Sequence, residues 1–355
     1  MTIVDKRQHT SGVVMSNPVV RHLVLIAQVA LIATLILPWQ AHAAGFRLLQ
    51  LADPGYKDLQ VGLWYPTSKL PPSEPNTEFG LSVAHDAPIA NVNGGLILIS
   101  HGFSGWYAGH ADTAAALADA GYVVAAPSHT GNTWSDMSSS PDQWLIDRPR
   151  HISRVLDQLL TDKHLSTVID PAKIGVYGFS AGGYTAIGLI GGIPDLKLAV
   201  RHCADHPQEF VCAQGMVDLI MAKRMDKLPA EAWGADPRVK AAVIAAPGFG
   251  FAYSQKSLEN VSAVVQLWSG ERDSSVPTET NAASLKARLP NPPETHWVDK
   301  AGHFAFLVVP CREAFRQADP EEYALICGNA EGFDRYAFHD EMHIEMVRFF
   351  DEAFR

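Results

Sequence analysis

One serine stands among three glycines in the stretch IGVYGFSAGGYTAIGLIGG, which covers residues 174–192. The residues before Ser180 are β-branched and aromatic, as in a buried strand, and those after it are small and apolar, as in a helix. Glycine weakens both kinds of element, so Gly178, Gly182 and Gly183 need a local reason. A sharp strand-to-helix turn supplies one, because it exposes the serine hydroxyl and crowds the positions two residues to either side. The spacing G-x-S-x-G therefore predicts that Ser180 is a nucleophile.

A serine hydroxyl is a weak nucleophile and needs a histidine base, which is in turn oriented by a carboxylate. On sheets that carry this turn, the carboxylate and then the histidine follow the serine along the chain. The segment LWSGERDSSVP places Asp273 just after an expected strand, and VDKAGHFAF places His303 just after the last one. Glu271, next to a strand end, and His296, inside a strand, are weaker alternatives. The order and the strand-end placement predict a triad of Ser180, Asp273 and His303.

Acyl transfer passes through a tetrahedral intermediate whose negatively charged oxygen needs backbone donors. The residue after the nucleophile supplies one N–H group, which is that of Ala181 here. The second donor comes from the loop after an earlier strand, where ISHGFSGW fits and the N–H group of Phe103 is our choice. Ser104 lies in the same loop but lacks the glycine spacing, so we interpret it as a loop residue.

Aromatic residues are frequent in the loops that follow the expected strands. Several of them belong to the core, but those at the strand ends are expected to line an apolar pocket for the acyl or alcohol part of a substrate. The candidates for substrate binding are Trp106, Tyr107, Phe179 and Phe304.

Strands and helices alternate along most of the chain. We expect strands over 59–66, 95–102, 122–127, 173–179, 239–247, 263–270 and 295–299, and helices over 111–121, 150–160, 181–190 and 343–354. Apolar strands that alternate with helices predict a mostly parallel central sheet with helices on both faces. Residues 69–95 are rich in Pro, Asn, Gly and Ser and are expected to form a loop. Residues 193–238 and 304–335 interrupt the alternation, and we expect these insertions to lie over the carboxyl ends of the strands, where such sheets bind ligands.

The N-terminal segment differs in composition from the rest of the chain. A positively charged residue precedes an apolar run over 23–37, and the small-residue sequence AHA follows it. This arrangement is typical of a secretory signal peptide, here 1–43, and the run is short for a membrane span. We therefore expect a periplasmic or secreted protein whose residues 44–355 form a single domain. An uncleaved anchor and a start at Met15 remain alternatives.

The chain contains four cysteines, which suits the oxidising compartment that export implies. Four cysteines allow three pairings. We expect the two local ones, Cys203 with Cys212 and Cys311 with Cys327, and the alternative is four free thiols.

Two short sequences, HCADH at 202–206 and HDEMH at 339–343, each place two histidines four residues apart. Neither has the glutamate directly after the first histidine that the zinc-binding sequence HExxH requires. We interpret both as incidental and expect no metal site.

Several stretches between about residue 60 and residue 311 resemble the bacterial predicted dienelactone hydrolases related to platelet-activating-factor acetylhydrolases: LWYPT, LILISHGFSG, GYVVAAPSHTGNT, RPRHISRVLDQLL, DPAKIGVYGFSAGGYTA, SGERDSSVP and AGHFAFLVVPC. Together they are far more specific than G-x-S-x-G alone. The resemblance implies the α/β-hydrolase fold, an esterase-type triad at Ser180, Asp273 and His303, and oxyanion N–H groups at Phe103 and Ala181. True dienelactone hydrolases use a cysteine nucleophile, so the serine argues against lactone chemistry.

The formal net charge of −10 and the absence of a basic run argue against binding to nucleic acid or to anionic membranes. We expect an exported serine carboxylic-ester hydrolase that acts on a small-molecule or lipid ester, without metal or organic cofactor. A serine peptidase or amidase on the same fold and a non-catalytic binding protein are the alternatives. The substrate, its acyl length and the oligomeric state stay open.

Overall fold

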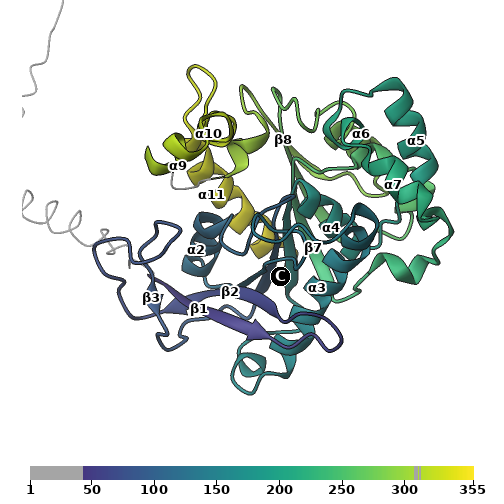
Figure 1. Ribbon diagram of the computed structural model, residues 1–355. Helices are drawn as coiled ribbons and strands as arrows, with labels where there is room; N and C mark the ends of the chain where they lie inside the picture. Colours follow the sequence, from purple (N-terminus) through teal and green to yellow (C-terminus); the bar gives the residue numbers. More distant parts are fainter. Residues whose placement is uncertain (1–42, 308–310, 312) are drawn as a thin grey trace, which may run out of the picture. The chain divides into compact units, whose positions relative to one another are not determined.

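The computed structural model describes residues 43–307, 311 and 313–355 (Figure 1). The expected signal peptide lies outside these residues, apart from Ala43 at its end. Among the helices of the described part, none has both the length and the apolar composition needed to cross a bilayer.

Within the described residues, nine strands form one sheet in the order β3-β1-β2-β5-β4-β6-β7-β8-β9. Neighbouring strands from β5 to β9 run parallel, whereas β2 is antiparallel to both β1 and β5. This arrangement confirms the expected mostly parallel sheet. The strands are β1 Ala43–Leu51, β2 Leu59–Thr67, β3 Ala84–His85, β4 Leu96–Ser100, β5 Val123–Pro127, β6 Ile174–Phe179, β7 Val239–Ala245, β8 Val264–Gly270 and β9 Glu294–Val298.

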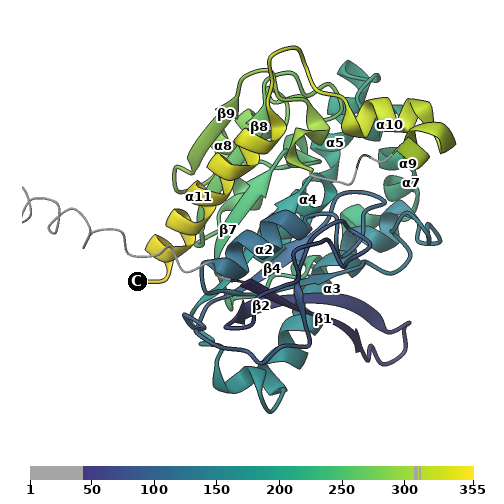
Figure 2. The same ribbon diagram turned by 90° about the vertical axis from the view of Figure 1, so that its left-hand side faces the viewer.

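Helices cover both faces of this sheet, as Figures 1 and 2 show. One face carries α2 and α11, and the other carries α3, α4 and α8. The α-helices are α2 Ala111–Asp119, α3 Pro141–Thr161, α4 Ala181–Leu189, α5 Leu196–Asp205, α6 Phe210–Ala213, α7 Met216–Ala222, α8 Ala282–Arg288, α9 Glu313–Ala318, α10 Pro320–Cys327 and α11 Arg335–Ala353.

Strand β4 shows how the sequence builds the two cores. All five of its residues are buried, and successive side chains of a strand point to opposite faces. Leu96 and Leu98 pack with the core under α3 and α4, whereas Ile97 and Ile99 pack with the core under α2 and α11. A strand covered on both faces is therefore apolar throughout instead of alternating.

The structure differs from the expectations at several elements. Strand β3, inside the expected loop of 69–95, and helix α8 were not expected, and α11 begins at Arg335, eight residues before the expected 343–354. β1 was not expected, because it begins at Ala43, where the signal peptide was expected to end. Helix α3 begins at Pro141, nine residues before the expected 150–160, and contains Pro149. Proline lacks an N–H group and normally ends a helix, which explains why the sequence favoured a later start.

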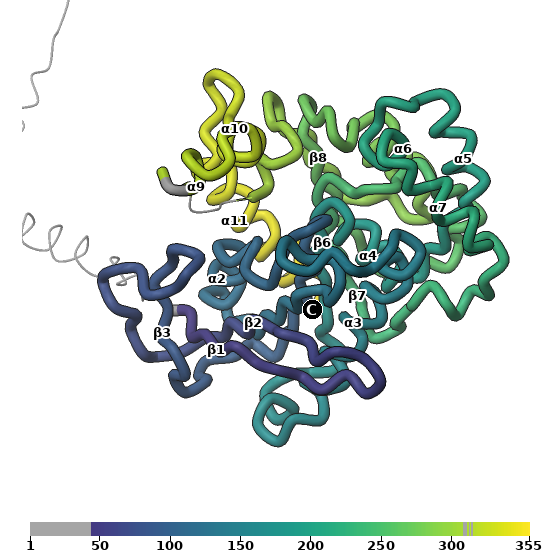
Figure 3. Tube along the Cα trace, viewed as in Figure 1, coloured from purple at the N-terminus to yellow at the C-terminus, as the bar shows by residue number. Residues whose placement is uncertain are grey.

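The two insertions fold as short helices at the same end of the sheet (Figure 3). Residues 193–238 contain α5, α6 and α7, and residues 304–335 contain α9 and α10. The cysteines pair as expected, since Cys203 bonds to Cys212 between α5 and α6, and Cys311 bonds to Cys327 at the end of α10. Each insertion therefore carries one disulfide.

Candidate active site

Ser180 lies at the junction of β6 and α4 with φ 56° and ψ −116°, a conformation that L-residues rarely adopt. The glycines around it are required by space. A Cβ atom on Gly178 would overlap the carbonyl group of Gly182, and one on Gly182 would overlap that of Ser100. A Cβ atom on Gly183 would lie 2.8 Å from Cα of Pro247. The turn therefore has the tight geometry that the spacing predicted.

The three residues of the expected triad form a continuous chain of hydrogen bonds. Oγ of Ser180 lies 3.0 Å from Nε2 of His303, and Nδ1 of His303 lies 2.7 Å from Oδ2 of Asp273. The other carboxylate oxygen of Asp273 accepts the backbone N–H groups of Ser275 and Val276 at 3.0 and 2.7 Å. All three triad side chains are buried. Asp273 is thus held so that His303 donates through Nδ1 and accepts the serine hydroxyl through Nε2.

The two weaker alternatives lie apart from this chain. Glu271 is exposed after β8. His296 stacks on Trp268 with the ring centroids 3.9 Å apart, and its Nε2 lies 2.7 Å from the carboxylate of Glu294. Neither residue lines the cavity at Ser180.

The two expected oxyanion donors flank the serine. Ala181 is the first residue of α4, where N–H groups have no partner inside the helix. The loop before Phe103 runs beside Ser180, because a Cβ atom on Gly102 would lie 3.5 Å from Cβ of Ser180. Among the described residues, the backbone N–H groups of Phe103 and Ala181 donate to no protein acceptor. Both are free to bind a ligand oxygen.

Ser180 and His303 open onto a cavity of about 510 Å³ with mostly apolar walls. Of the four expected substrate-binding residues, Trp106, Phe179 and Phe304 line this cavity. Both insertions contribute to it, as expected, and the sequence could not select which of their residues reach it. These additional lining residues are Phe210, Leu307, Glu322, Leu325 and Ile326. The exposed Trp134, from the loop after β5, also lines the cavity.

Tyr107 is the expected substrate-binding residue that the structure does not bring to this cavity. It is buried in the core under α2, with its ring centroid 6.3 Å from that of Phe46, and its hydroxyl donates to Glu78 at 2.8 Å. Burial and this carboxylate raise the pKa of Tyr107. The neighbouring Trp106 faces the cavity instead, so the two adjacent aromatic side chains have different surroundings.

Two further histidines line the cavity, and both are held in the neutral form. Burial lowers the pKa of His110 to about 4, and burial together with the cation of Arg148 holds the pKa of His101 well below its usual range. His303 differs from them because its Nδ1 contacts the carboxylate of Asp273. Of the three histidines, it is therefore the one that joins a serine hydroxyl to a carboxylate.

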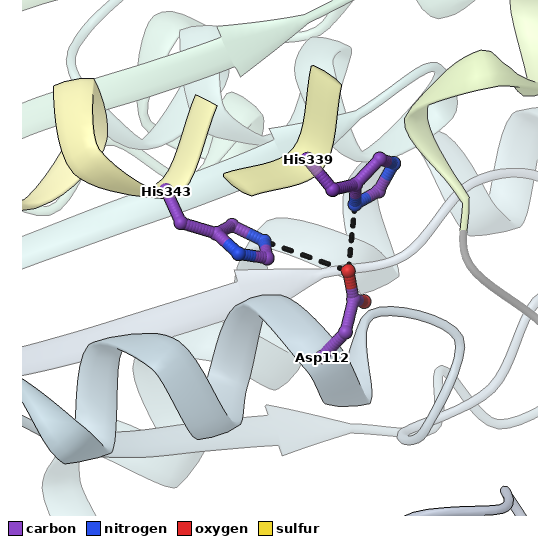
Figure 4. A group of neighbouring side chains, drawn as sticks. All are labelled: Asp112, His339 and His343. Carbon is purple, nitrogen blue, oxygen red and sulfur yellow. Dashed lines mark hydrogen bonds and ion pairs between the residues drawn. The ribbon is translucent and has the colours of Figure 1, made fainter. Parts of the chain in front are cut away.

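The histidines of HDEMH meet an aspartate that the sequence did not suggest (Figure 4). Oδ2 of Asp112 in α2 lies 2.6 Å from Nδ1 of His339 and 3.5 Å from Nε2 of His343. Such residues can bind zinc, but two ligand atoms on one tetrahedral zinc ion stand about 3.3 Å apart. The 2.6 Å contact is instead that of a direct hydrogen bond. Nε2 of His339 also donates to the carbonyl of Ala305, which ties α11 and α2 to the segment carrying His303.

The other potential metal ligands are engaged in protein contacts. Cys203 of HCADH is in a disulfide, and His202 lies 3.0 Å from the carboxylate of Glu209. The group of Glu294, His296 and Glu345 is exposed to solvent in part, and both of its carboxylates form ion pairs with Arg348.

With the geometry established, comparison with known proteins defines the class. The model of the dienelactone hydrolase family matches residues 85–214, which confirms the expected resemblance over the segment that contains Phe103 and Ser180. Among solved structures, a ferulic acid esterase from Streptomyces cinnamoneus is 21% identical with a TM-score of 0.59, and the match covers 89% of this chain and 91% of that one. No curated protein sequence matches.

This protein therefore has the α/β-hydrolase fold. Its likeness to dienelactone hydrolases lies in residues 85–214, which end before Asp273 and His303. The two comparisons together support a hydrolase that acts on ester bonds. Because 910 chains of solved structures match, the fold alone does not select a substrate.

Proposed function

We propose that this protein is an exported serine carboxylic-ester hydrolase. The observation that carries the proposal is the chain of hydrogen bonds from Ser180 through His303 to Asp273 at the floor of an apolar cavity. A binding protein would need the cavity but not the aligned hydroxyl, imidazole and carboxylate, so this arrangement favours catalysis.

The proposed reaction has two halves. In the first, Oγ of Ser180 attacks the acyl carbon while Nε2 of His303 takes the hydroxyl proton. The N–H groups of Phe103 and Ala181 stabilise the oxyanion, the ester C–O bond breaks, and His303 gives its proton to the leaving alcohol.

In the second half, water attacks the acyl-enzyme and His303 takes a proton from it. The bond between the acyl carbon and Oγ breaks, the acid leaves, and Ser180 regains its hydrogen. Throughout, Asp273 keeps the imidazole oriented and stabilises its charged form.

The walls of the cavity favour a neutral ester with an apolar or aromatic acyl group. Aromatic rings of Phe103, Trp106 and Phe210 line it, and among its described lining residues the one ionisable side chain apart from the histidines is the acidic Glu322. An adjoining cavity of about 210 Å³, which shares His303, is lined by the basic residues Arg272 and Lys300 instead. Small aryl esters, like lipid esters with short acyl chains, suit such walls. The similar solved structure is named a ferulic acid esterase, and this name agrees with an aryl ester as the substrate.

The disulfides support the exported location. A thiol-reducing cytosol would disfavour them, whereas a periplasmic or secreted protein would keep them. We further propose that 1–43 is the signal peptide and that 44–355 is a single domain.

The function is tested with p-nitrophenyl esters of graded acyl length and the matching p-nitroanilides. We expect ester hydrolysis by the wild type, and a loss of kcat of at least about 10⁴-fold in Ser180→Ala, because the nucleophile acts as a unit with its base. Ser166→Ala, an exposed serine in the short helix Leu165–Thr167, is the matched control and should keep full activity. Full ester activity in Ser180→Ala would refute the proposal, and faster anilide than ester hydrolysis would favour a peptidase.

A further inference from the structure

Arg148 of α3 is a fully buried cation beneath the proposed oxyanion loop. Burial lowers its pKa to about 9, so the guanidinium remains charged at neutral pH. Among the described residues, no carboxylate lies within 4.0 Å of it. A buried charge without a counter-ion is costly, so this one needs a compensating role.

The guanidinium donates its hydrogen bonds to neutral acceptors, and two of these acceptors are consecutive backbone carbonyl groups of one loop. Nη1 donates to the carbonyl of His101 at 2.6 Å, and Nη2 donates to that of Gly102 at 2.7 Å. Nε donates to the side-chain oxygen of the buried Asn132 at 2.8 Å. Arg148 therefore holds the backbone just before Phe103.

The ring of His101 provides a second donor to the carbonyl of Gly102. Its Nε2 accepts the backbone N–H group of His129 at 3.0 Å, so in the neutral ring the hydrogen must sit on Nδ1. That Nδ1 donates to the carbonyl of Gly102 at 2.7 Å. The 3.4 Å approach of Arg148 to the same Nδ1 joins two donors and is not a hydrogen bond. The Gly102 carbonyl thus receives two strong donors from one side.

The other titratable groups around Arg148 leave its charge uncompensated. Nδ1 of His129 faces Nδ1 of His151 at 3.3 Å, and Nε2 of His129 contacts the hydroxyl of Ser100. The pKa of His129 is held well below its usual range, mainly by burial and then by the charge of Arg148. The pKa of His151 is lowered to about 3 by burial and by the neighbouring arginines. Neither ring supplies an opposing negative charge.

The planarity of the peptide bond carries this effect to the proposed oxyanion site. In a trans peptide the C=O and N–H groups point in opposite directions. Because the carbonyl of Gly102 is directed at Arg148, the N–H group of Phe103 on the same peptide is directed away from it, while the loop lies against Ser180. A cation bonded to the carbonyl end also polarises the peptide and strengthens its N–H group as a donor.

We propose that Arg148 is a positioning residue for the oxyanion hole: it fixes the peptide between Gly102 and Phe103 and supplies the positive charge behind it. The inference rests on the proposed ester hydrolysis and deepens it. Arg148 does not touch the substrate, so its effect passes through the Phe103 N–H group and should appear in the transition state more than in substrate binding.

The test compares Arg148→Met, Arg148→Lys and the matched control Arg154→Met in the full chain. Arg154 lies on the same helix and also donates to a backbone carbonyl, that of Ala52, away from the cavity. Each variant is assayed with a p-nitrophenyl ester for kcat and KM. The inhibition constant of a boronic acid is measured as well. A boronic acid forms a tetrahedral anionic adduct with a serine hydroxyl, so this constant reports how well the site binds an analogue of the charged tetrahedral intermediate. Titration of active sites corrects for misfolded protein.

For Arg148→Met we expect kcat per active site to fall about 100-fold, as for loss of one oxyanion donor. KM should change little, and the inhibition constant of the boronic acid should rise in parallel with the loss of kcat. Arg148→Lys keeps the charge but not the paired contacts, so its kcat should be intermediate. Arg154→Met should match the wild type.

A kcat within about threefold of the wild type in Arg148→Met, or an unchanged boronic-acid constant beside a lower kcat, would overturn the inference. If Arg148→Met does not fold, Arg148→Lys carries the same test, and a wild-type kcat there would also overturn it. Absence of ester hydrolysis in the wild type would instead refute the proposed function, and this inference would then fall with it.

Discussion

At the scale of single residues, chemistry restricts which side chains can occupy the proposed site. Gly182 lies against the carbonyl of Ser100, and this contact brings α4 close to the end of β4. The same approach places the nucleophile beside the loop with Phe103. Gly182 therefore lowers the helix propensity of α4, but its lack of a side chain lets the backbones of α4 and β4 come into contact.

Gly182→Ala tests this contact. The new Cβ atom would overlap the Ser100 carbonyl, so we expect a loss of about 3 kcal/mol in the free energy of unfolding and a marked fall in kcat as Ser180 shifts. Urea denaturation and ester assays measure the two effects. Gly55→Ala is the contrast, because that exposed position has open space and only a positive φ, so the loss there should stay near 1 kcal/mol without a change in kcat. Equal losses at both positions would contradict the account.

At the scale of elements, both insertions contribute walls to the cavity above Ser180 and His303. Phe210 from α6 and Leu325 from α10 line the same cavity although they belong to different insertions. Among the described residues of the insertion 304–335, only Ala305 and Phe306 are buried and apolar, and this insertion carries the Cys311–Cys327 disulfide. A cross-link compensates for a small core by restricting the unfolded chain.

Removal of the Cys311–Cys327 disulfide should separate the contribution of this insertion to stability from its contribution to the cavity wall. In the double variant Cys311→Ser and Cys327→Ser, we expect a loss of about 3 kcal/mol in stability, because the link closes a loop of 16 residues. The wall of α10 should loosen, so KM for longer acyl chains should rise while kcat stays close to the wild-type value. Guanidinium denaturation and acyl-length profiles report both. The double variant Cys203→Ser and Cys212→Ser serves as the comparison. A large fall in kcat with unchanged KM on loss of the Cys311–Cys327 disulfide would argue that α10 does not act as a wall of the cavity.

At the scale of the whole molecule, the sheet brings together residues that lie far apart in the chain. Ser180 follows β6, Asp273 follows β8 and His303 follows β9. These strands run parallel with β7 among them, so their carboxyl ends point to the same edge. The histidine reaches the serine over a separation of 123 residues.

The proposed export is a property of the whole chain and predicts a defined mature protein. N-terminal sequencing of the exported protein should begin at Ala44, and its thiols should be oxidised in non-reducing mass mapping. Replacement of the small residues before the site, Ala41→Arg with Ala43→Arg, should leave the segment attached. Ser166→Ala serves as the processed control. Four free thiols would contradict export, and a mature chain that keeps residues 1–43 would contradict cleavage of a signal peptide.

The sequence by itself predicted the proposed chemistry and the order of the proposed site residues along the chain. The glycine spacing predicted Ser180 as the nucleophile, and the positions just after expected strands predicted Asp273 and His303 as its partners, because these are demands of local geometry and chain order. The fold class followed from apolar strands alternating with helices, since a strand buried on both faces must be apolar throughout.

Only the tertiary structure decided which side chains surround that site. The sequence does not tell that Trp106 faces the cavity whereas Tyr107 joins the core, nor that Asp112 meets His339, because such placements depend on packing between distant elements. Arg148 is the strongest example. Its charge suggests an exposed residue, and only the folded chain turns it toward the two backbone carbonyls of His101 and Gly102, in the loop beside Ser180.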